Sequence, residues 1–341
     1  STGVGRADYS GVTFGDGNGT IEQAINANGT LGMTQNGTTV ASAPSGASGA
    51  DYSATVTSNS DLDNTLVINT ANLADAGTKQ NSYTVSNNGN GTVSVTPTDG
   101  SDLNKLTSLT LDTGSKDGDI DVFGDVVPAD GPAGTVKSTT QLHGLTELVV
   151  TGNGNTTVNA SVGSNTITKL TVDASELNGS FSTGDGGILS AKNIDFTGSD
   201  FADFLTVAPR GNGTDPIDLG NGADTIVYNL GTPFESATMA KSTVKLGSND
   251  GAKDTVNVAG TGTGTNNQGT IITVQDFVFG QDVVNSIKAD ESLISYAVFA
   301  DKSAMEKVIK TGFSESSVTL TNISADGTLG FVQSGSNWDV Y

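Results

Sequence analysis

Two consecutive stretches of nine residues place glycine and aspartate at a spacing that suits an oxygen-rich cation site. They run from Gly211 to Leu219 and from Gly220 to Tyr228, and both follow the pattern G-x-G-x-D. The glycines let the backbone turn tightly and direct its carbonyls to one side, while the aspartate adds a carboxylate. Calcium prefers oxygen ligands only, so the pattern predicts a calcium site. Its candidate residues are Gly211, Gly213, Asp215, Gly220, Gly222 and Asp224.

Further acidic turns occur elsewhere in the chain. A longer variant of the same turn contains Gly247, Asp250 and Asp254. Residues 15–20 and 117–121 are also acidic turns and are weaker calcium candidates, because such turns are more often simply solvated. The alternative for all of these sequences is that glycine and asparagine join strands without any metal.

The tandem resembles the RTX repeats of proteins exported by bacterial type I secretion. Residues 272–284 strengthen the likeness, because they are similar to the I-x-D-F-x-x-G-x-D-x-I segment that commonly follows RTX arrays. The resemblance covers residues 211–285 and implies a parallel β-roll that holds calcium between the turns of successive coils. It also implies a C-terminal secretion signal and folding in calcium after export. Two nonapeptides form one coil in this family, so Asp224 would need a partner in the turn of Asp250 or Asp254, and one to a few ions would bind.

Charge and composition limit the possible partners. The 341 residues include 37 acidic and 15 basic side chains, which gives a net charge of −22. Nucleic acid is excluded as a partner, because binding it requires lysine and arginine to neutralise phosphates. Divalent cations are the natural counterions, although acidity also serves solubility alone. The absence of cysteine excludes disulfides, and no apolar run is long enough to predict a transmembrane segment.

Short runs of Val, Ile, Leu and Thr, separated by Gly, Asn and Asp, predict an all-β protein. Residues 1–100 form a β-rich region with a short helical candidate at 21–25. In the same region, segments 83–86 and 92–95 flank Asn-Asn-Gly-Asn-Gly and predict an antiparallel hairpin.

Residues 101–210 contain an internal repeat of alternating apolar and polar residues. Its copies begin at Leu106, Leu145, Ile167 and Ala191, which are 39, 22 and 24 residues apart. A period in the twenties predicts the coils of a β-solenoid. The gap of 39 residues indicates a coil that is missing, irregular or enlarged. The alternative is chance recurrence in a threonine-rich chain.

The resemblance predicts that residues 211–341 form an RTX-like calcium-binding region with a C-terminal secretion segment. A helix is predicted at 303–310 from capping-box spacing, and a terminal hairpin is predicted around 324–327. The predicted fold is therefore a parallel β-solenoid or β-roll with additional antiparallel hairpins and few short helices.

Signatures of catalysis are absent from the sequence. His143 is the only histidine, and neither G-x-S-x-G nor H-E-x-x-H occurs, so we expect no enzyme activity. Richness in Thr, Ser, Asn and Gly, acidity and lack of cysteine resemble surface-layer proteins of Gram-negative bacteria. The resemblance predicts an extracellular, cell-surface subunit that assembles with copies of itself into a lattice or filament, with cell-surface polysaccharide as a further partner. The alternatives are a calcium-stiffened adhesin or glycan-binding module, and a β-helix carbohydrate-active enzyme.

Overall fold

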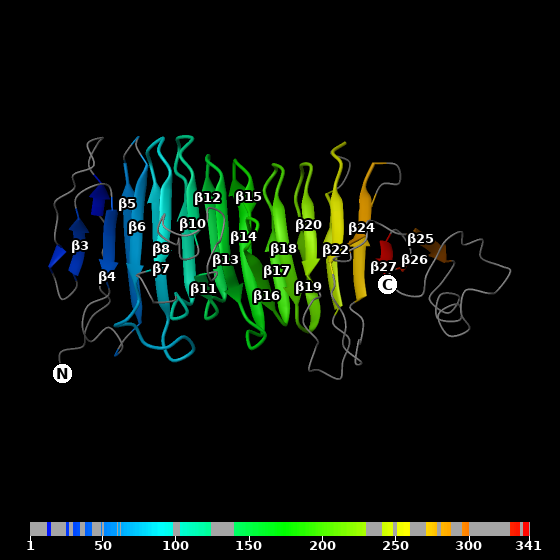
Figure 1. Ribbon diagram of the computed structural model, residues 1–341, viewed down its shortest axis with the longest axis horizontal. Coiled ribbons are helices and arrows are strands. Elements are labelled where there is room, and N and C mark those ends of the chain that lie inside the picture. Colours follow the sequence, from blue (N-terminus) through cyan, green and yellow to red (C-terminus); the bar gives the residue numbers. More distant parts are fainter. Residues whose placement is uncertain are drawn as a thin grey trace, which may run out of the picture.

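The structure is a computed structural model that describes the chain in segments. The described residues are 12–14, 25–26, 30–34, 38–42, 49, 51–59, 61, 63–97, 103–123, 140–229, 241–247, 251–259, 271–277, 281–287, 295–299, 328–334 and 337–340. In these segments the chain forms a parallel β-solenoid, with strands stacked into two long sheets (Figure 1). The predicted all-β, parallel solenoid class is confirmed.

Two sheets, named A and B here, contain all the strands of the described segments. Sheet A consists, in spatial order, of β1 (Val12–Phe14), β5 (Tyr52–Ser58), β7 (Asn81–Asn87), β9 (Ser108–Asp112), β12 (Glu147–Gly152), β14 (Lys169–Leu177), β17 (Asn193–Thr197), β19 (Asn212–Asp218), β21 (Lys241–Lys245), β23 (Ile271–Gln275), β27 (Asn337–Val340), β26 (Thr328–Ser334) and β25 (Ser295–Phe299). Sheet B consists of β2 (Ile25–Asn26), β3 (Thr30–Thr34), β4 (Thr38–Ser42), β6 (Asn64–Asn69), β8 (Val93–Pro97), β10 (Ile120–Phe123), β13 (Thr156–Gly163), β15 (Phe181–Ser182), β18 (Phe204–Pro209), β20 (Thr225–Asn229), β22 (Thr255–Ala259) and β24 (Val283–Ile287), with β11 (Thr140–Leu142) and β16 (Ile188–Ala191) paired to β13.

From β5 to β24 the chain passes repeatedly from sheet A to sheet B and back, and each strand pairs in parallel with the strand of the next coil. The pairing continues without interruption past residues 100 and 210. Antiparallel pairing occurs at the ends, where β3 pairs with β2 and β4, and β27 pairs with β23 and β26.

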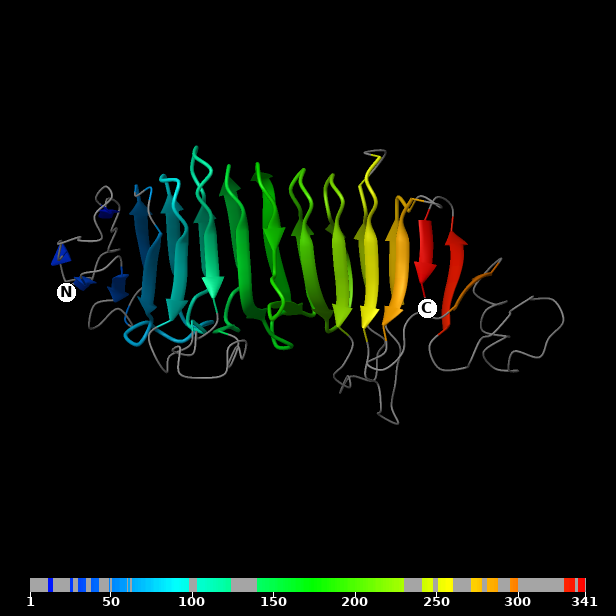
Figure 2. The same cartoon turned by 45° about the horizontal axis from the view of Figure 1, so that its top comes forward.

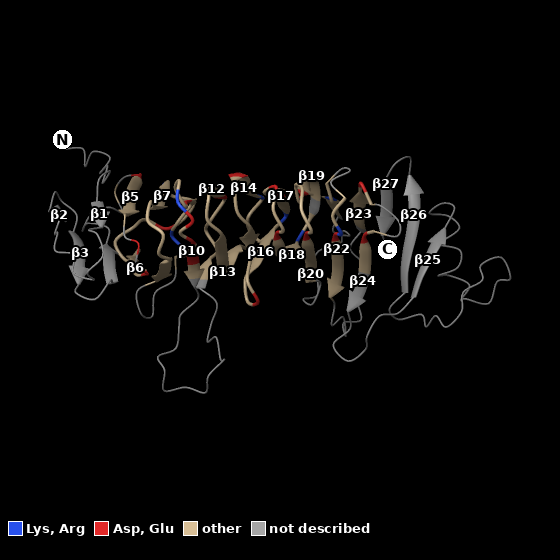
Figure 3. Cartoon of the chain, turned by 90° about the horizontal axis from the view of Figure 1, so that it is seen from above, with Lys and Arg blue, Asp and Glu red and all other residues tan. Residues whose placement is uncertain are grey.

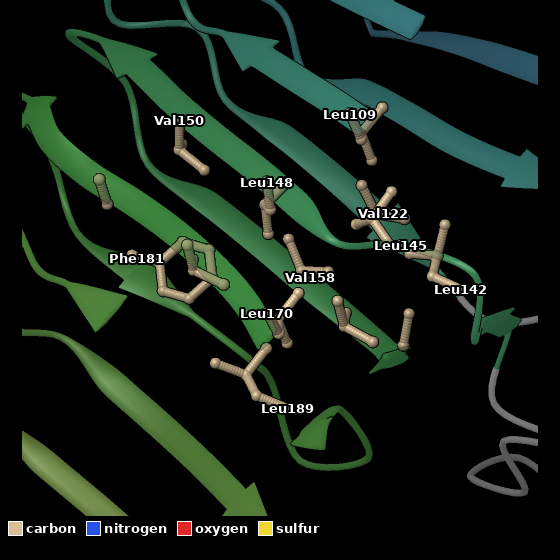
Figure 4. Packing of buried hydrophobic residues seen from close by; sticks show 14 of the residues in the cluster. Leu109, Val122, Leu142, Leu145, Leu148, Val150, Val158, Leu170, Phe181 and Leu189 are labelled. Atoms are coloured by element: carbon tan, nitrogen blue, oxygen red, sulfur yellow. The ribbon is translucent and has the colours of Figure 1, made fainter. Parts of the chain in front are cut away.

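The core lies between the two sheets. Along the strands every second side chain is buried, as in β5 and β7, because successive residues of a strand point to opposite faces. Figure 4 shows the aliphatic side chains of both sheets gathered in this core, among them Leu148 of β12 and Val158 of β13. Two aromatic pairs join neighbouring coils, and in each the ring centroids are 5.7 Å apart: Tyr52 with Tyr83, and Phe181 with Phe196.

The internal repeat corresponds to neighbouring strands of sheet A. Strand β9 pairs with β12 at an offset of 39 residues, and β14 pairs with β17 at an offset of 24, as predicted. Because β9 and β12 are direct neighbours, no coil is missing, and the long gap is one enlarged coil. The predicted offset of 22 is wrong: Leu148 lies opposite Val172, an offset of 24. A shift of two residues keeps both side chains in the core, so the sequence pattern could not detect it.

The hairpin predicted from segments 83–86 and 92–95 is also wrong. Strand β7 belongs to sheet A and β8 to sheet B, and each pairs in parallel with adjacent coils. The Asn-Gly turn between them is a corner of the solenoid.

Of the helical candidate at 21–25, Ile25 is in β2 and the other residues lie outside the described part of the chain. The predicted helix at 303–310 and the turn at 324–327 also lie outside it.

Within the described residues, no helix is long and apolar enough to cross a membrane.

Candidate calcium-binding corner

The corners that lead from sheet A to sheet B are short and stack along one edge of the solenoid, at the top of Figure 2. Gly220 and Gly222 form one of them with φ angles of +86° and +119°, and Gly247 occupies the next corner with a φ of +88°. A Cβ atom on Gly220 would lie 2.0 Å from the carbonyl oxygen of Ser199, and one on Gly247 would lie 2.2 Å from that of Gly220. The stacked backbones therefore leave room only for glycine at these positions.

A column of four aspartates closes these corners, each directly before a strand of sheet B. Asp203, Asp224, Asp254 and Asp282 occupy successive coils, and their exposed fractions are 2%, 0%, 2% and 7%. The backbone N–H of Asp203 donates to Oδ1 of Asp224 (2.8 Å), that of Asp224 to Oδ1 of Asp254 (2.9 Å), and that of Asp254 to Oδ1 of Asp282 (3.1 Å). We call these four residues the aspartate column. Figure 3 views the molecule from above, and the Asp and Glu positions of the described residues are coloured red on the ribbon.

The earlier corners carry a related but reversed ladder. There the carboxylate or amide of one coil accepts from the backbone N–H of the following coil. The N–H of Asn155 donates to Oδ1 of Asp119 (2.7 Å), and the N–H of Ser180 donates to Oδ1 of Asn155 (3.0 Å). The N–H of Phe181 donates the other way, to Oδ1 of Asp203 (2.7 Å). The two ladders therefore meet at Ser180 and Phe181, and only the later one is made of buried aspartates.

Asp203 shows what burial does to a carboxyl group in this column. Burial raises its pKa to about 6, although hydrogen bonds from the N–H groups of Phe181 and Ser199 and from the Ser199 hydroxyl lower it. The carboxylate form of Asp203 is therefore held at a free-energy cost. A bound cation would offset this cost, because it favours the charged form.

The structure divides the residues predicted from sequence between the edge that carries the aspartate column and strand β19. Gly220, Gly222 and Asp224 share one corner, and Gly247 and Asp254 lie in the adjacent coil of the same edge, so this part of the predicted set is brought together. Asp250 lies outside the described residues.

The first nonapeptide lies elsewhere. Gly211 precedes β19, and Gly213 and Asp215 are within that strand. Oδ2 of Asp215 lies 2.8 Å from Nζ of Lys169 and accepts a hydrogen bond of 2.7 Å from Asn193. The hydrogen bond from Lys169 is the main reason that the pKa of Asp215 is lowered. Asp215 is thus engaged on the outer face of sheet A and does not join the aspartate column.

Sequence inspection missed Asp203, and it included Asp282 only within the segment 272–284. The corner before Asp203 carries Phe201 where the next corner carries Gly222, so the G-x-G-x-D pattern is absent there. The available signal was the position of Asp203 immediately before an alternating strand, which matches that of Asp224 before Thr225. Of the weaker candidates, Asp119 belongs to the reversed ladder, whereas residues 15–20 lie outside the described segments.

The donor groups at the column fit calcium in one specific way. Across the part of the chain that the structure describes, no three Asp, Glu or His side chains converge to form a metal-binding cluster. An ion at this edge would therefore combine one or two carboxylates with backbone carbonyls of the glycine corners. Calcium accepts such mixed and irregular oxygen sets, whereas magnesium requires near-ideal octahedral geometry.

Known proteins provide no assignment for this chain. No family model, curated protein or solved structure matches it. The parallel solenoid is compatible with the β-roll that the RTX resemblance implies.

Proposed function

We propose that this protein is a structural subunit of a bacterial surface layer or other extracellular assembly, folded and assembled with calcium. The aspartate column is the observation that carries the proposal. It places buried carboxylates in consecutive coils of a chain whose net charge is −22. A buried charge is costly unless it is paired or coordinates a metal, so a column of this kind favours cation binding.

In this proposal Asp224 and Asp254 provide the carboxylates, and the corners of Gly220, Gly222 and Gly247 provide carbonyl oxygens. Bound calcium would supply positive charge between coils that otherwise repel one another. The chain's own residues fix the corners: the glycines allow the backbones to stack, and the Oδ1–backbone hydrogen bonds orient the carboxylates. Calcium would then stabilise the later coils of the solenoid more than the earlier ones.

A structural role suits the shape of the molecule. The solenoid is elongated, with its two sheets running along the long axis (Figure 1), and it presents regular faces that can be repeated in an assembly. Export by a type I system, an extracellular location and kinship with surface-layer proteins belong to the same proposal. They are supported by the RTX-like sequence, the acidity and the absence of cysteine.

Calcium titration followed by light scattering and electron microscopy tests the proposal. Ordered sheets or filaments should form in millimolar calcium, dissolve in chelator, and fail to form in equimolar magnesium. A protein that remains monomeric at every calcium concentration would refute the structural role. Retention of glycans by such a monomer would favour the adhesin reading, and turnover of polysaccharide would favour an enzyme.

A further inference from the structure

The outer faces of the two sheets differ sharply in charge. Among the described strands of sheet B from β6 to β24, Asp121 is the only charged residue. The strands of sheet A from β9 to β21 carry ten: Asp112, Glu147, Lys169, Asp173, Glu176, Asp195, Asp215, Asp218, Lys241 and Lys245. Each coil contributes one strand to sheet A and one to sheet B. The charged strands and the neutral strands therefore collect on opposite outer faces of the solenoid.

Apart from Asp121, the side chains on the outer face of sheet B are neutral; most are Thr, Ser or Asn, and Val67, Ile188, Phe204 and Val227 are also partly exposed there. In β13 the partly exposed residues are Thr157, Asn159 and Ser161, which alternate with buried ones. Thr206 of β18 and Thr225 of β20 lie on the same face in later coils. We call this surface face B. Parallel pairing holds its side chains in rows along the solenoid, about 4.8 Å apart from strand to strand.

Asp121, the one charged residue in the described strands of face B, is partly buried. Burial raises the pKa of Asp121, a hydrogen bond with Thr157 lowers it, and the nearby charge of Asp119 raises it. Asp121 is thus easier to neutralise than a fully solvated carboxylate. The strands of sheet A from β9 to β21 carry seven acidic residues and three lysines, so two copies that met at that face would bring net negative charges together and repel each other.

The size of face B matches a stable interface. The nine coils from β6 to β24 extend it to about 38 Å at the usual strand spacing, and strands of about five residues make it about 17 Å wide. That gives roughly 650 Å² of flat surface, which is near the ~800 Å² per partner of a standard protein interface. A flat face of regular rows is also self-complementary under a two-fold axis.

We infer that face B is the surface through which two copies of this chain pack against each other, sheet to sheet. The inference rests on the proposed structural role and names the contact that the role requires. The copies would lie about 10 Å apart at the interface, as packed sheets do. The charged outer face of sheet A would remain exposed on both sides of the pair.

A charge-insertion experiment tests face B. The double variant Thr206→Glu/Thr225→Glu places two negative charges on neighbouring strands of face B, at diagonal positions. The matched control Ser82→Glu/Thr110→Glu places the same charges at diagonal positions on β7 and β9, on the outer face of sheet A. In calcium, the face B variant should need at least about tenfold more protein to assemble than wild type, which corresponds to about 1.4 kcal/mol. The control should assemble like wild type.

Spin labels provide a second measurement that does not depend on how charged variants fold. The chain has no cysteine, so Thr225→Cys and Thr110→Cys each create a single labelling site. Assembly should bring two labels at position 225 within range for distance measurement by pulsed electron resonance, whereas labels at position 110 should remain far apart.

The outcomes separate the inference from the proposed function. Assembly that is unaffected by the face B charges, or proximity only at position 110, would overturn the inference and leave the structural role intact. Assembly through face B that persists in chelator would support the inference and would remove calcium from the proposed function. A wild-type monomer that retains neutral polysaccharide, with binding lost in the face B variant, would overturn the second-copy inference.

Discussion

The backbone N–H of Asp224 donates a hydrogen bond of 2.9 Å to Oδ1 of Asp254, which lies thirty residues later and one coil away. The same contact links Asp203 to Asp224 and Asp254 to Asp282. A carboxylate of each coil therefore fixes the corner of the coil before it. Because all four side chains are buried, negative charge on this column is costly unless a polar partner or a bound cation offsets it.

Asp224 and Asp218 should differ in their effect on calcium. Asp224 is buried at the corner, whereas Asp218 is at the end of β19, where Oδ2 accepts a hydrogen bond of 3.1 Å from Lys245. Loss of a group that only orients a metal's ligands commonly reduces metal affinity about 10–100-fold, so loss of a carboxylate that would itself bind the ion, as in Asp224→Ala, should weaken calcium binding at least about tenfold. Asp218→Ala should have little effect. Isothermal titration calorimetry would count against this assignment if the two variants bound calcium equally.

Gly220 and Gly77 allow the crowding of the corners to be measured separately from backbone strain. Both have positive φ, +86° and +91°, but a Cβ on Gly77 meets nothing within 4 Å. Gly77→Ala should cost about 1–2 kcal/mol in the free energy of unfolding, from the left-handed conformation alone. Gly220→Ala should cost about 1–3 kcal/mol more, because its Cβ would clash with the carbonyl oxygen of Ser199 and the preceding corner would have to move. Equal losses in urea denaturation would show that the stacked corners relax freely.

Asp203 should make the calcium-free protein more stable in mild acid. Its pKa of about 6 in the folded chain lies above the usual value of 3.8, so the folded state binds the proton more tightly than the unfolded chain. The resulting stability is fully present below about pH 4 and is lost as the pH rises through about 6. At about 1.4 kcal/mol per pKa unit, the maximum contribution is about 3 kcal/mol.

The comparison between two variants isolates this contribution. In chelator, Asp203→Asn should flatten the dependence of unfolding free energy on pH between 4 and 7. Asp185→Asn removes the same charge from an exposed position and should leave that dependence unchanged. A wild-type protein whose stability is constant across this range would contradict the role of Asp203.

The sequence predicted what depends on local pattern. Alternation of apolar and polar residues indicated the strands, and the spacing of repeat copies indicated coils, as β9 and β12 show. Asn-Gly sequences indicated a chain reversal after β7 but could not distinguish a hairpin from a corner, because both require positive φ or tight turning. Whether the turn after β7 is a hairpin or a corner depends on which strands pair, and the pairing is determined by how all the coils stack.

The aspartate column illustrates the same limit at the candidate site. Asp224 and Asp254 were recognisable because each follows a glycine turn. Asp203 lacks that turn, and its place in the column depends on the register between β18 and β20. Face B was equally hidden, because its neutral surface emerges only when the strands of alternate half-coils are collected into one sheet.

Hydrogen exchange in calcium and in chelator tests most directly whether calcium orders the corners. With calcium, the N–H groups of Asp203, Asp224 and Asp254 should exchange slowly, because their acceptors in the next coil are held in place. In chelator, residues 211–258 should lose protection while β5 and β7 keep theirs, because dense carboxylates repel one another without the cation. Unchanged protection of residues 211–258 in chelator would contradict the account.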